Sequence, residues 1–181
     1  MTLEDIVDTD RHPIIRSGFA AKSATILDRD GVLVLAGFIR PAALDVILAE
    51  SVAKQDQAYF CTQKHSVYLS PHDPALPGDH PANRQVTSSK GCICDDEIAA
   101  DSPLRRLYHD PQFQAFIAQV TRQQAVHPYA DPLSSINIHY ANRGQDLGWH
   151  FDNSSFAITL LIQKPDAGSA FEYIKNLMRG I

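Results

Sequence analysis

The sequence is poor in cysteine, in long apolar runs and in positive charge. Its cysteines are Cys61, Cys92 and Cys94, an odd number that does not make a disulfide framework. A reducing cytoplasm is the simple expectation. No apolar run approaches the roughly 20 residues that span a bilayer. The acidic start of the chain lacks the pattern of a signal peptide. We therefore expect a cytoplasmic protein without a membrane partner.

The scarcity of positive charge argues against nucleic-acid binding. Lys and Arg number 16 against 21 Asp and Glu, and the formal net charge is −5. No basic stripe is available to neutralise phosphates. What the chain does have is a hydrophobic content of 44% in 181 residues, which suits one domain with a core. A small molecule is the substrate that this balance favours, and the oligomeric state is left open.

Helical patterns dominate the first 130 residues. We expect a short helix within residues 1–25, a helix from Pro41 to about Gln55, a short helix with Pro103 at its first position, and another over residues 111–124. The run from Gly31 to Ile39 is apolar and bounded by glycines, which predicts a buried strand. Residues 61–95 contain four prolines, and we expect a long loop or lid there.

From Ser134 the pattern changes to a period of two residues. Ile136, Ile138 and Tyr140 alternate with polar residues, which is typical of a half-buried strand. Further short strands are predicted over residues 149–152, 156–163 and 170–174. Helices followed by consecutive strands favour an α+β fold with an antiparallel sheet or barrel. We expect one domain over residues 1–181, with a helical part at 1–130 and a β core from 134.

The tripeptide His150-Phe151-Asp152 carries the chemical hypothesis. Residues two apart on a strand point to the same face, so an imidazole and a carboxylate can meet one cation. Taken alone the pattern is weak, because the composition supplies about 0.75 His-x-Asp matches by chance. The plain alternative is a strand with two ordinary polar residues.

The surrounding sequence resembles a known superfamily. Residues 137–173 resemble the double-stranded β-helix core of iron- and 2-oxoglutarate-dependent oxygenases, with Ser169 as a departure from the usual Gly-Gly-x-Phe. A closer resemblance is to the free-amino-acid hydroxylases and halogenases of that superfamily. The pieces that match the superfamily core are Tyr140, Gly144, Trp149-His150-Phe151-Asp152, the strand ending in Gln163, and Gly168 to Tyr173. The pieces that match the amino-acid enzymes are His80-Pro81 with Arg84, Asp101 to Arg105, Tyr129 to Leu133, and Leu147 to Phe151.

The resemblance implies a fold, two cofactors and a set of site residues. Helices would pack on a jelly-roll or cupin-like β-helix. Fe(II) would be held by His150 and Asp152, as two of its three protein ligands, and 2-oxoglutarate would be the cosubstrate. The halogenases have glycine or alanine where Asp152 stands, so the carboxylate favours hydroxylation of a small molecule, a free amino acid above all. The 2-oxoglutarate candidates are Asn137, His139 and Tyr140, and the substrate candidates are Arg84 and Asn153.

Each of these secondary candidates has an ordinary alternative. Asn137 and His139 share a strand face that is either a cavity lining or plain surface, and Tyr140 points the other way by alternation. Arg84 fits a solvated loop equally, and Asn153 fits a turn. The histidines of the proline-rich stretch, His65 among them, are expected at the surface.

The sequence departs from the superfamily in its last part. No histidine follows His150, and no arginine or lysine is a confident match for the base that pairs with 2-oxoglutarate. Three explanations stand: a fragment of a longer protein, which we favour and which leaves the β-helix incomplete at its C-terminus; a non-catalytic binding module; or a third iron ligand from His139 or Glu172.

Overall fold

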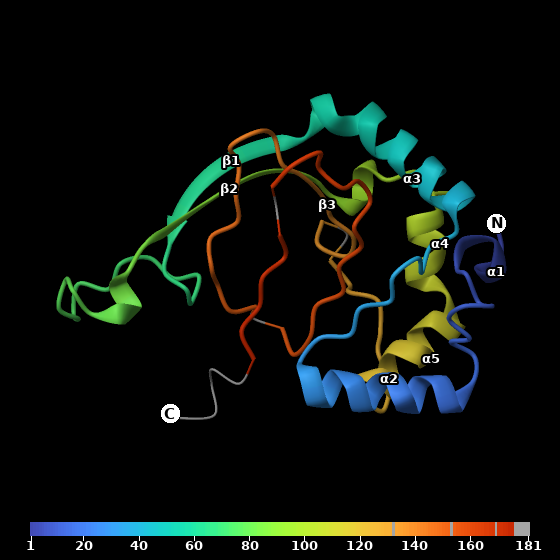
Figure 1. Ribbon diagram of the computed structural model, residues 1–181. Helices are drawn as coiled ribbons and strands as arrows, with labels where there is room; N and C mark the ends of the chain where they lie inside the picture. The colour runs from blue at the N-terminus through green and yellow to red at the C-terminus, as the bar shows by residue number, and fades with distance from the viewer. Residues whose placement is uncertain (132, 153, 169, 176–181) are drawn as a thin grey trace.

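The protein combines a helical body with a small antiparallel sheet. The computed structural model describes residues 1–131, 133–152, 154–168 and 170–175. The helices form one end of the molecule, and a long hairpin of two strands extends away from them (Figure 1). The α-helices are α1 (Leu3–Ile6), α2 (Ser17–Asp30), α3 (Pro41–Lys54), α4 (Pro103–His109) and α5 (Pro111–Val120).

The helix boundaries follow from capping residues that the sequence contains. Thr2 and Asp5 form a capping box at the start of α1. Ser102 and Asp110 accept backbone N–H groups at the starts of α4 and α5, each with a proline in the next position. Gly31 ends α2 in the left-handed conformation, with φ of 75°. The expected helix beginning at Pro41 is confirmed, and the one beginning at Pro111 ends earlier than expected.

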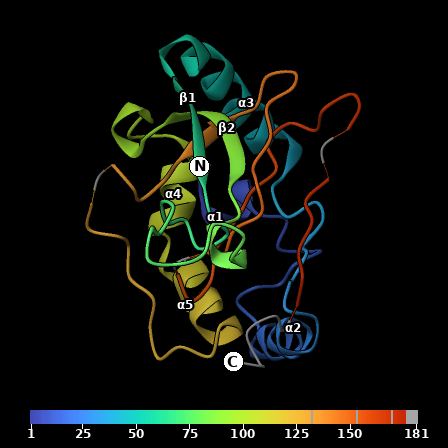
Figure 2. The same cartoon turned by 90° about the vertical axis from the view of Figure 1, so that its left-hand side faces the viewer.

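A hydrophobic core holds the helices together. Ile6, Val7, Ile47 and Phe116 are almost fully buried there. α2 and α5 lie side by side in both views (Figures 1 and 2), and the rings of Phe19 and Phe116 stack between them with centroids 5.8 Å apart. Burial of these side chains supplies about 1.5–3 kcal/mol each. The helical body is therefore the stable base of the fold.

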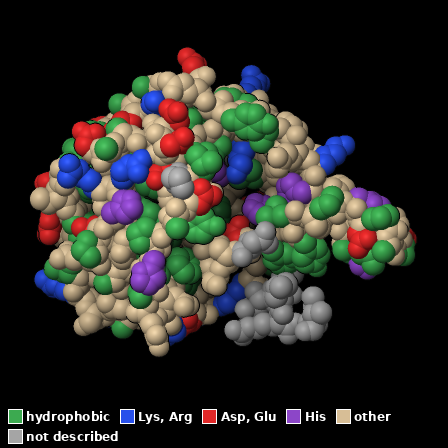
Figure 3. Space-filling view, turned by 180° about the vertical axis from the view of Figure 1, so that it is seen from behind, with side chains coloured by type: hydrophobic (Ala, Val, Ile, Leu, Met, Phe, Trp, Pro, Cys, Tyr) green, Lys and Arg blue, Asp and Glu red, His purple; other side chains and the backbone are tan. Residues whose placement is uncertain are grey.

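Three strands make the sheet, in the order β1 (Tyr59–His65), β2 (Val86–Ile93), β3 (Ile138–Tyr140). Both pairings are antiparallel, with His65 opposite Val86, Gln63 opposite Ser88, and His139 opposite Cys92. Residues 66–85 connect β1 to β2 and form the projecting tip of the molecule. Seen from behind, this tip carries histidine side chains among hydrophobic ones (Figure 3).

The two faces of the sheet have different characters because side chains alternate along each strand. One face, here called the polar face, carries the side chains of Gln63, His65, Ser88, Lys90, Cys92 and His139, together with those of Tyr59, Cys61 and Val86. The other face carries Ile93, Ile138 and Tyr140, which pack toward the helical body. The Tyr140 hydroxyl donates to the Ser51 carbonyl of α3 at 2.7 Å. The sheet thus presents its polar face away from α3.

The predicted strand over residues 31–39 is wrong. Only Ile39 pairs, in an isolated bridge with Val7, and Val34 is 76% exposed. The reason lies in the two glycines: Gly31 and Gly37 both adopt positive φ, which breaks an extended run. Leu33, Leu35 and Phe38 still pack against the helical core. The apolar pattern therefore indicated contact with the core correctly, but the segment does not pair with another strand.

The expected division into a helical part and a later β core also needs correction. β1 and β2 lie within residues 1–130. They occupy parts of both ends of the proline-rich stretch 61–95, which was expected to be a loop throughout. Residues 149–152, 156–163 and 170–174, which were expected as strands, belong to no ladder, although all of them are described. A strand forms only by pairing with another strand, and no described segment pairs continuously with residues 149–152, 156–163 or 170–174. The double-stranded β-helix stays a prediction.

None of the helices in the described ranges is long and apolar enough to cross a bilayer.

Candidate metal centre

The segment that carries His150 follows the edge of β2. After β3 the chain turns out over residues 141–145 and then returns to the same edge. Ser89 donates its backbone N–H to the Asp146 carbonyl at 2.7 Å, and Gly148 donates its N–H to the Ser88 hydroxyl at 2.9 Å. A Cβ on Gly148 would lie 2.8 Å from the Val86 side chain and 3.0 Å from the Thr87 carbonyl. Glycine therefore permits the close approach.

Two contacts of Phe151 dock this segment on the end of the hairpin. Phe151 donates its N–H to the Val67 carbonyl at 2.8 Å, and its ring stacks on Tyr68 with centroids 5.4 Å apart. The turn that presents both groups is organised by Ser66, which is fully buried and whose hydroxyl accepts the Tyr68 N–H. Phe151 is thus anchored on both its backbone and its ring.

His150 and Asp152 point to one another beyond this anchor. Nε2 of His150 lies 3.4 Å from Oδ1 of Asp152. Nδ1 of His150 lies 2.8 Å from the Gly148 carbonyl, which can only accept, so Nδ1 carries the proton. In the neutral form of the imidazole, Nε2 therefore carries a lone pair on the side of the carboxylate. The imidazole is 29% exposed and the carboxylate 57% exposed, so the pair opens to solvent.

This pair fits two ligands of one iron ion. Ligand bonds of about 2.1 Å at right angles place the donor atoms about 3 Å apart, close to the observed separation. A metal-ligating histidine ordinarily donates its other ring N–H to a carbonyl or carboxylate, as His150 does to Gly148. The donor set, one imidazole and one carboxylate, is that of the facial arrangement expected from the sequence.

A third protein ligand is not provided by the described residues. They contain no group of three His, Cys, Asp or Glu side chains placed to hold a metal ion. His139 lies beside Lys90, whose ammonium is 3.3 Å from its Nε2, and Glu172 is exposed. The hypothesis that His139 or Glu172 joins His150 and Asp152 therefore finds no support in the geometry.

His65 is the residue that sequence reasoning misplaced. It was expected at the surface, yet it is 9% exposed and its ring lies perpendicular to that of His150, with centroids 6.1 Å apart. Its Nε2 lies 2.7 Å from the Ser88 hydroxyl. Ser88 was not singled out either. The signal available in the sequence was alternation: residues 86, 88, 90 and 92 share a face once a strand is assigned there.

The three candidates for 2-oxoglutarate divide between the two faces. Asn137 and His139 lie on the polar-face side, where Asn137 approaches the Cys92 thiol at 3.5 Å. Tyr140 lies on the opposite face and is bonded to Ser51, as simple alternation predicts. Partial desolvation lowers the pKa of His139, and the Lys90 ammonium lowers it further. Lys90 is a cation on the same face that the sequence analysis missed.

The two substrate candidates are not brought to the pair by any contact. Arg84 is exposed at the end of a 3₁₀ turn (Pro81–Asn83), two residues before β2, and its guanidinium makes no hydrogen bond to the described residues. Asn153 lies outside the described residues.

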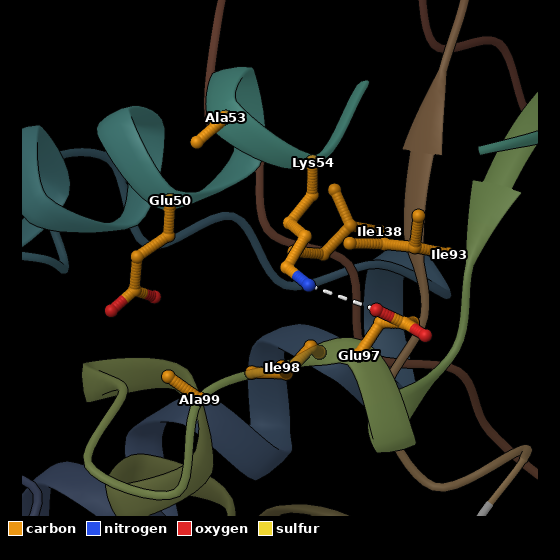
Figure 4. Close-up of a pocket in the computed structure, with 8 residues that line it drawn as sticks. All are labelled: Glu50, Ala53, Lys54, Ile93, Glu97, Ile98, Ala99 and Ile138. Atoms are coloured by element: carbon orange, nitrogen blue, oxygen red, sulfur yellow. Dashed lines mark hydrogen bonds and ion pairs between the residues drawn. The ribbon is translucent and has the colours of Figure 1, made fainter. Parts of the chain in front are cut away.

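A pocket of about 190 Å³ lies elsewhere, on the opposite face of the sheet from His65 and Ser88. Ile93, Ile98 and Ile138 line it, and the Lys54 ammonium meets the Glu97 carboxylate at 2.9 Å beside them (Figure 4). The Glu50 carboxylate there accepts the Ser102 hydroxyl at 2.6 Å. Its charged groups are already paired or hydrogen-bonded, so we do not place the chemistry there.

Comparison with known proteins identifies the family. The model of the family described as Halogenase D matches residues 79–178, more than half of the 181-residue chain. The match includes β2, α4, α5, β3 and the segment with His150 and Asp152. No curated protein and no solved structure matches the chain. The chain therefore belongs to the Halogenase D family.

Proposed function

We propose that this chain provides two iron ligands of an Fe(II)- and 2-oxoglutarate-dependent oxygenase that hydroxylates a small molecule. The observation that carries the proposal is the His150–Asp152 pair, with donor atoms 3.4 Å apart and the Nδ1–H of His150 held by a carbonyl. Membership of a halogenase family supports an oxidative enzyme. Bound Fe(II) would supply activation of O₂ together with 2-oxoglutarate, which leaves as succinate and CO₂ while one oxygen atom enters a C–H bond.

Asp152 favours hydroxylation over halogenation. A carboxylate on the iron takes the coordination position that a halide needs, and the halogenases that this sequence resembles have glycine or alanine there. In this chain the carboxylate faces the Nε2 atom of His150 rather than a surface cation. The proposal is therefore a hydroxylase within a family named for halogenases.

A free amino acid is the proposed class of substrate. The resemblance of the stretch around His80 and Arg84 to the amino-acid enzymes supports it. The polar face carries donors and a cation, Lys90, beside His139, which suits a small polar molecule better than an apolar one. 2-Oxoglutarate is proposed to bind along the same face, near Asn137 and His139.

Absorption spectroscopy under nitrogen tests the cofactor part of the proposal. Addition of Fe(II) and 2-oxoglutarate to the chain should give a visible metal-to-ligand charge-transfer band, because the keto acid chelates iron only where protein ligands hold it. Asp152→Ala and His150→Ala should each abolish or weaken the band, and His72→Ala, an exposed histidine of the hairpin tip, should not. Absence of the band in the unchanged chain would favour a non-catalytic binding module.

Product analysis tests the reaction. The chain is incubated with Fe(II), 2-oxoglutarate, O₂, chloride and a panel of free amino acids, and products are examined by mass spectrometry. The proposal predicts gain of one oxygen atom with matched formation of succinate. Replacement of hydrogen by chlorine would contradict the role given to Asp152. The variant Asp152→Gly is the matched comparison, because it opens the coordination position for chloride.

A further inference from the structure

A chain of hydrogen bonds joins the end of β1 to the proposed iron pair. It begins at the Ser66 carbonyl, which lies 2.8 Å from Nδ1 of His65. It continues from Nε2 of His65 to the Ser88 hydroxyl at 2.7 Å, and from that hydroxyl to the Gly148 N–H at 2.9 Å. The Gly148 carbonyl then accepts the Nδ1–H of His150 at 2.8 Å. Two strands and the His150 segment are thus linked in series.

The direction of each proton follows from the partners at the two ends. The Ser66 carbonyl has no proton, so Nδ1 of His65 donates to it, and in the neutral form of the imidazole Nε2 then accepts. The Ser88 hydroxyl therefore donates to His65 and keeps its lone pairs for the Gly148 N–H. This bond holds the Gly148 nitrogen on Ser88, and the Gly148 carbonyl, on the other side of the same Cα, accepts the Nδ1–H of His150. Every group in the series has one consistent role.

The burial of the first part of the series, at His65 and Ser66, argues that it is more than incidental surface bonding. His65 is 9% exposed and Ser66 is fully buried, although the strand β1 is otherwise mostly open to solvent. A buried polar group that loses its partner costs about 1–3 kcal/mol, so these groups are held to their partners. The edge of the His65 ring also meets His150 directly, with an interplanar angle of 90°. Both contacts restrict how the His150 imidazole turns.

We infer that His65 and Ser88 are positioning residues that fix the tautomer and orientation of His150 for metal binding. Neither would bind the metal: Ser88 acts through its hydrogen bond to the Gly148 N–H, and His65 acts through Ser88 and through its ring contact with His150. The part of this inference that concerns iron binding rests on the proposed function. The hydrogen-bond series itself does not require a metal, so it is tested separately.

The test uses Ser88→Ala, Ser88→Thr and a control, Thr87→Val. Ser88→Ala removes the hydroxyl at the centre of the series, and Ser88→Thr restores it on a residue that strands favour. Thr87 is the neighbour whose side chain lies on the opposite face and makes no hydrogen bond within the described residues. Each variant is the full chain, labelled with ¹⁵N at histidine, and the first readout is the imidazole nitrogen resonances without metal.

In the unchanged chain, the resonances of His150 should show protonation at Nδ1 alone. Ser88→Ala should convert His150 to a mixture of tautomers, while Ser88→Thr and Thr87→Val should keep the original spectrum. An unaltered His150 spectrum in Ser88→Ala overturns the inference, whatever the chain does with iron.

The second readout is the dissociation constant for Fe(II) with 2-oxoglutarate. Loss of a group that contacts a ligating histidine typically weakens metal affinity about 10–100-fold. Ser88 is one step further from His150, so we expect Ser88→Ala to raise the dissociation constant by about 3- to 10-fold. A tautomer change without any iron binding would contradict the proposed function and leave the series standing. A tautomer change with unchanged iron affinity would overturn the positioning role.

Discussion

The ring of Tyr68 stacks on the ring of Phe151 at a centroid distance of 5.4 Å, where the hairpin connection meets the segment that holds His150 and Asp152. The Val67 carbonyl accepts the Phe151 N–H beside this stack. Docking of the segment with His150 and Asp152 thus depends on a turn that is distant in sequence.

Replacing Tyr68 tests this docking. Tyr68→Ala should accelerate hydrogen exchange at the Phe151 amide and lower the free energy of unfolding by about 0.5–1.5 kcal/mol, the range for an aromatic pair. The control is Tyr59→Ala, because Tyr59 is 73% exposed on β1. Equal exchange rates at Phe151 in both variants would show that the stack does not hold the segment.

Gly148 is predicted to tolerate no side chain. Gly148→Ala would place a Cβ 2.8 Å from the Val86 side chain and 3.0 Å from the Thr87 carbonyl, so the segment must move off β2. We expect weaker Fe(II) binding and faster exchange of the Gly148 amide. Gly144→Asn is a control in open space at a positive φ that asparagine accepts. Undiminished iron binding by Gly148→Ala would contradict the close approach.

Asp95 has a structural role at the start of the 3₁₀ turn Asp95–Glu97. It is 6% exposed, accepts the Ser135 hydroxyl at 2.6 Å, and pairs with Arg105 at 2.9 Å. Asp95→Asn should lower the free energy of unfolding by about 1–3 kcal/mol, measured by urea denaturation. Asp96→Asn, at an exposed neighbour, should change it little. Similar midpoints for the two variants would contradict this assignment.

The pH dependence of His139 follows from its lowered pKa. The unfolded chain has the ordinary value of 6.5 and takes up a proton first as pH falls. Stability from this side chain is therefore complete above about that pH and is lost as pH falls below it. An NMR titration should give a midpoint below 6.5, and Lys90→Gln should raise the midpoint because it removes the second cause of the shift. An unmoved midpoint in Lys90→Gln would exclude the influence of Lys90.

The sequence predicted the features that local rules control. Pro41, Ser102 with Pro103, and Asp110 with Pro111 mark the starts of α3, α4 and α5, because capping and proline act within one turn. The contact between His150 and Asp152 is also local, within three residues, although the strand expected over residues 149–152 is absent. These predictions need no knowledge of distant partners.

The features that were missed depend on distant pairing. β1 and β2 are rich in Thr, Gln, Lys and Ser, so their composition does not mark them as buried strands, and only their mutual register makes them a hairpin. His65 and Ser88 become neighbours of Gly148 through that register. Conversely, residues 31–39 have a strand composition, but positive φ at Gly31 and Gly37 prevents a ladder. Local pattern therefore singled out His150 and Asp152 and overlooked His65 and Ser88.

The most direct test of the central claim is calorimetric titration of Fe(II) under nitrogen, with 2-oxoglutarate present, into the unchanged chain and three variants. His150→Ala and Asp152→Ala should each lower the affinity for Fe(II) by about tenfold or more, because each removes a side chain proposed to bond the iron directly. His72→Ala should bind as the unchanged chain does. Equal affinity in all four proteins would contradict the assignment of His150 and Asp152 as the iron ligands.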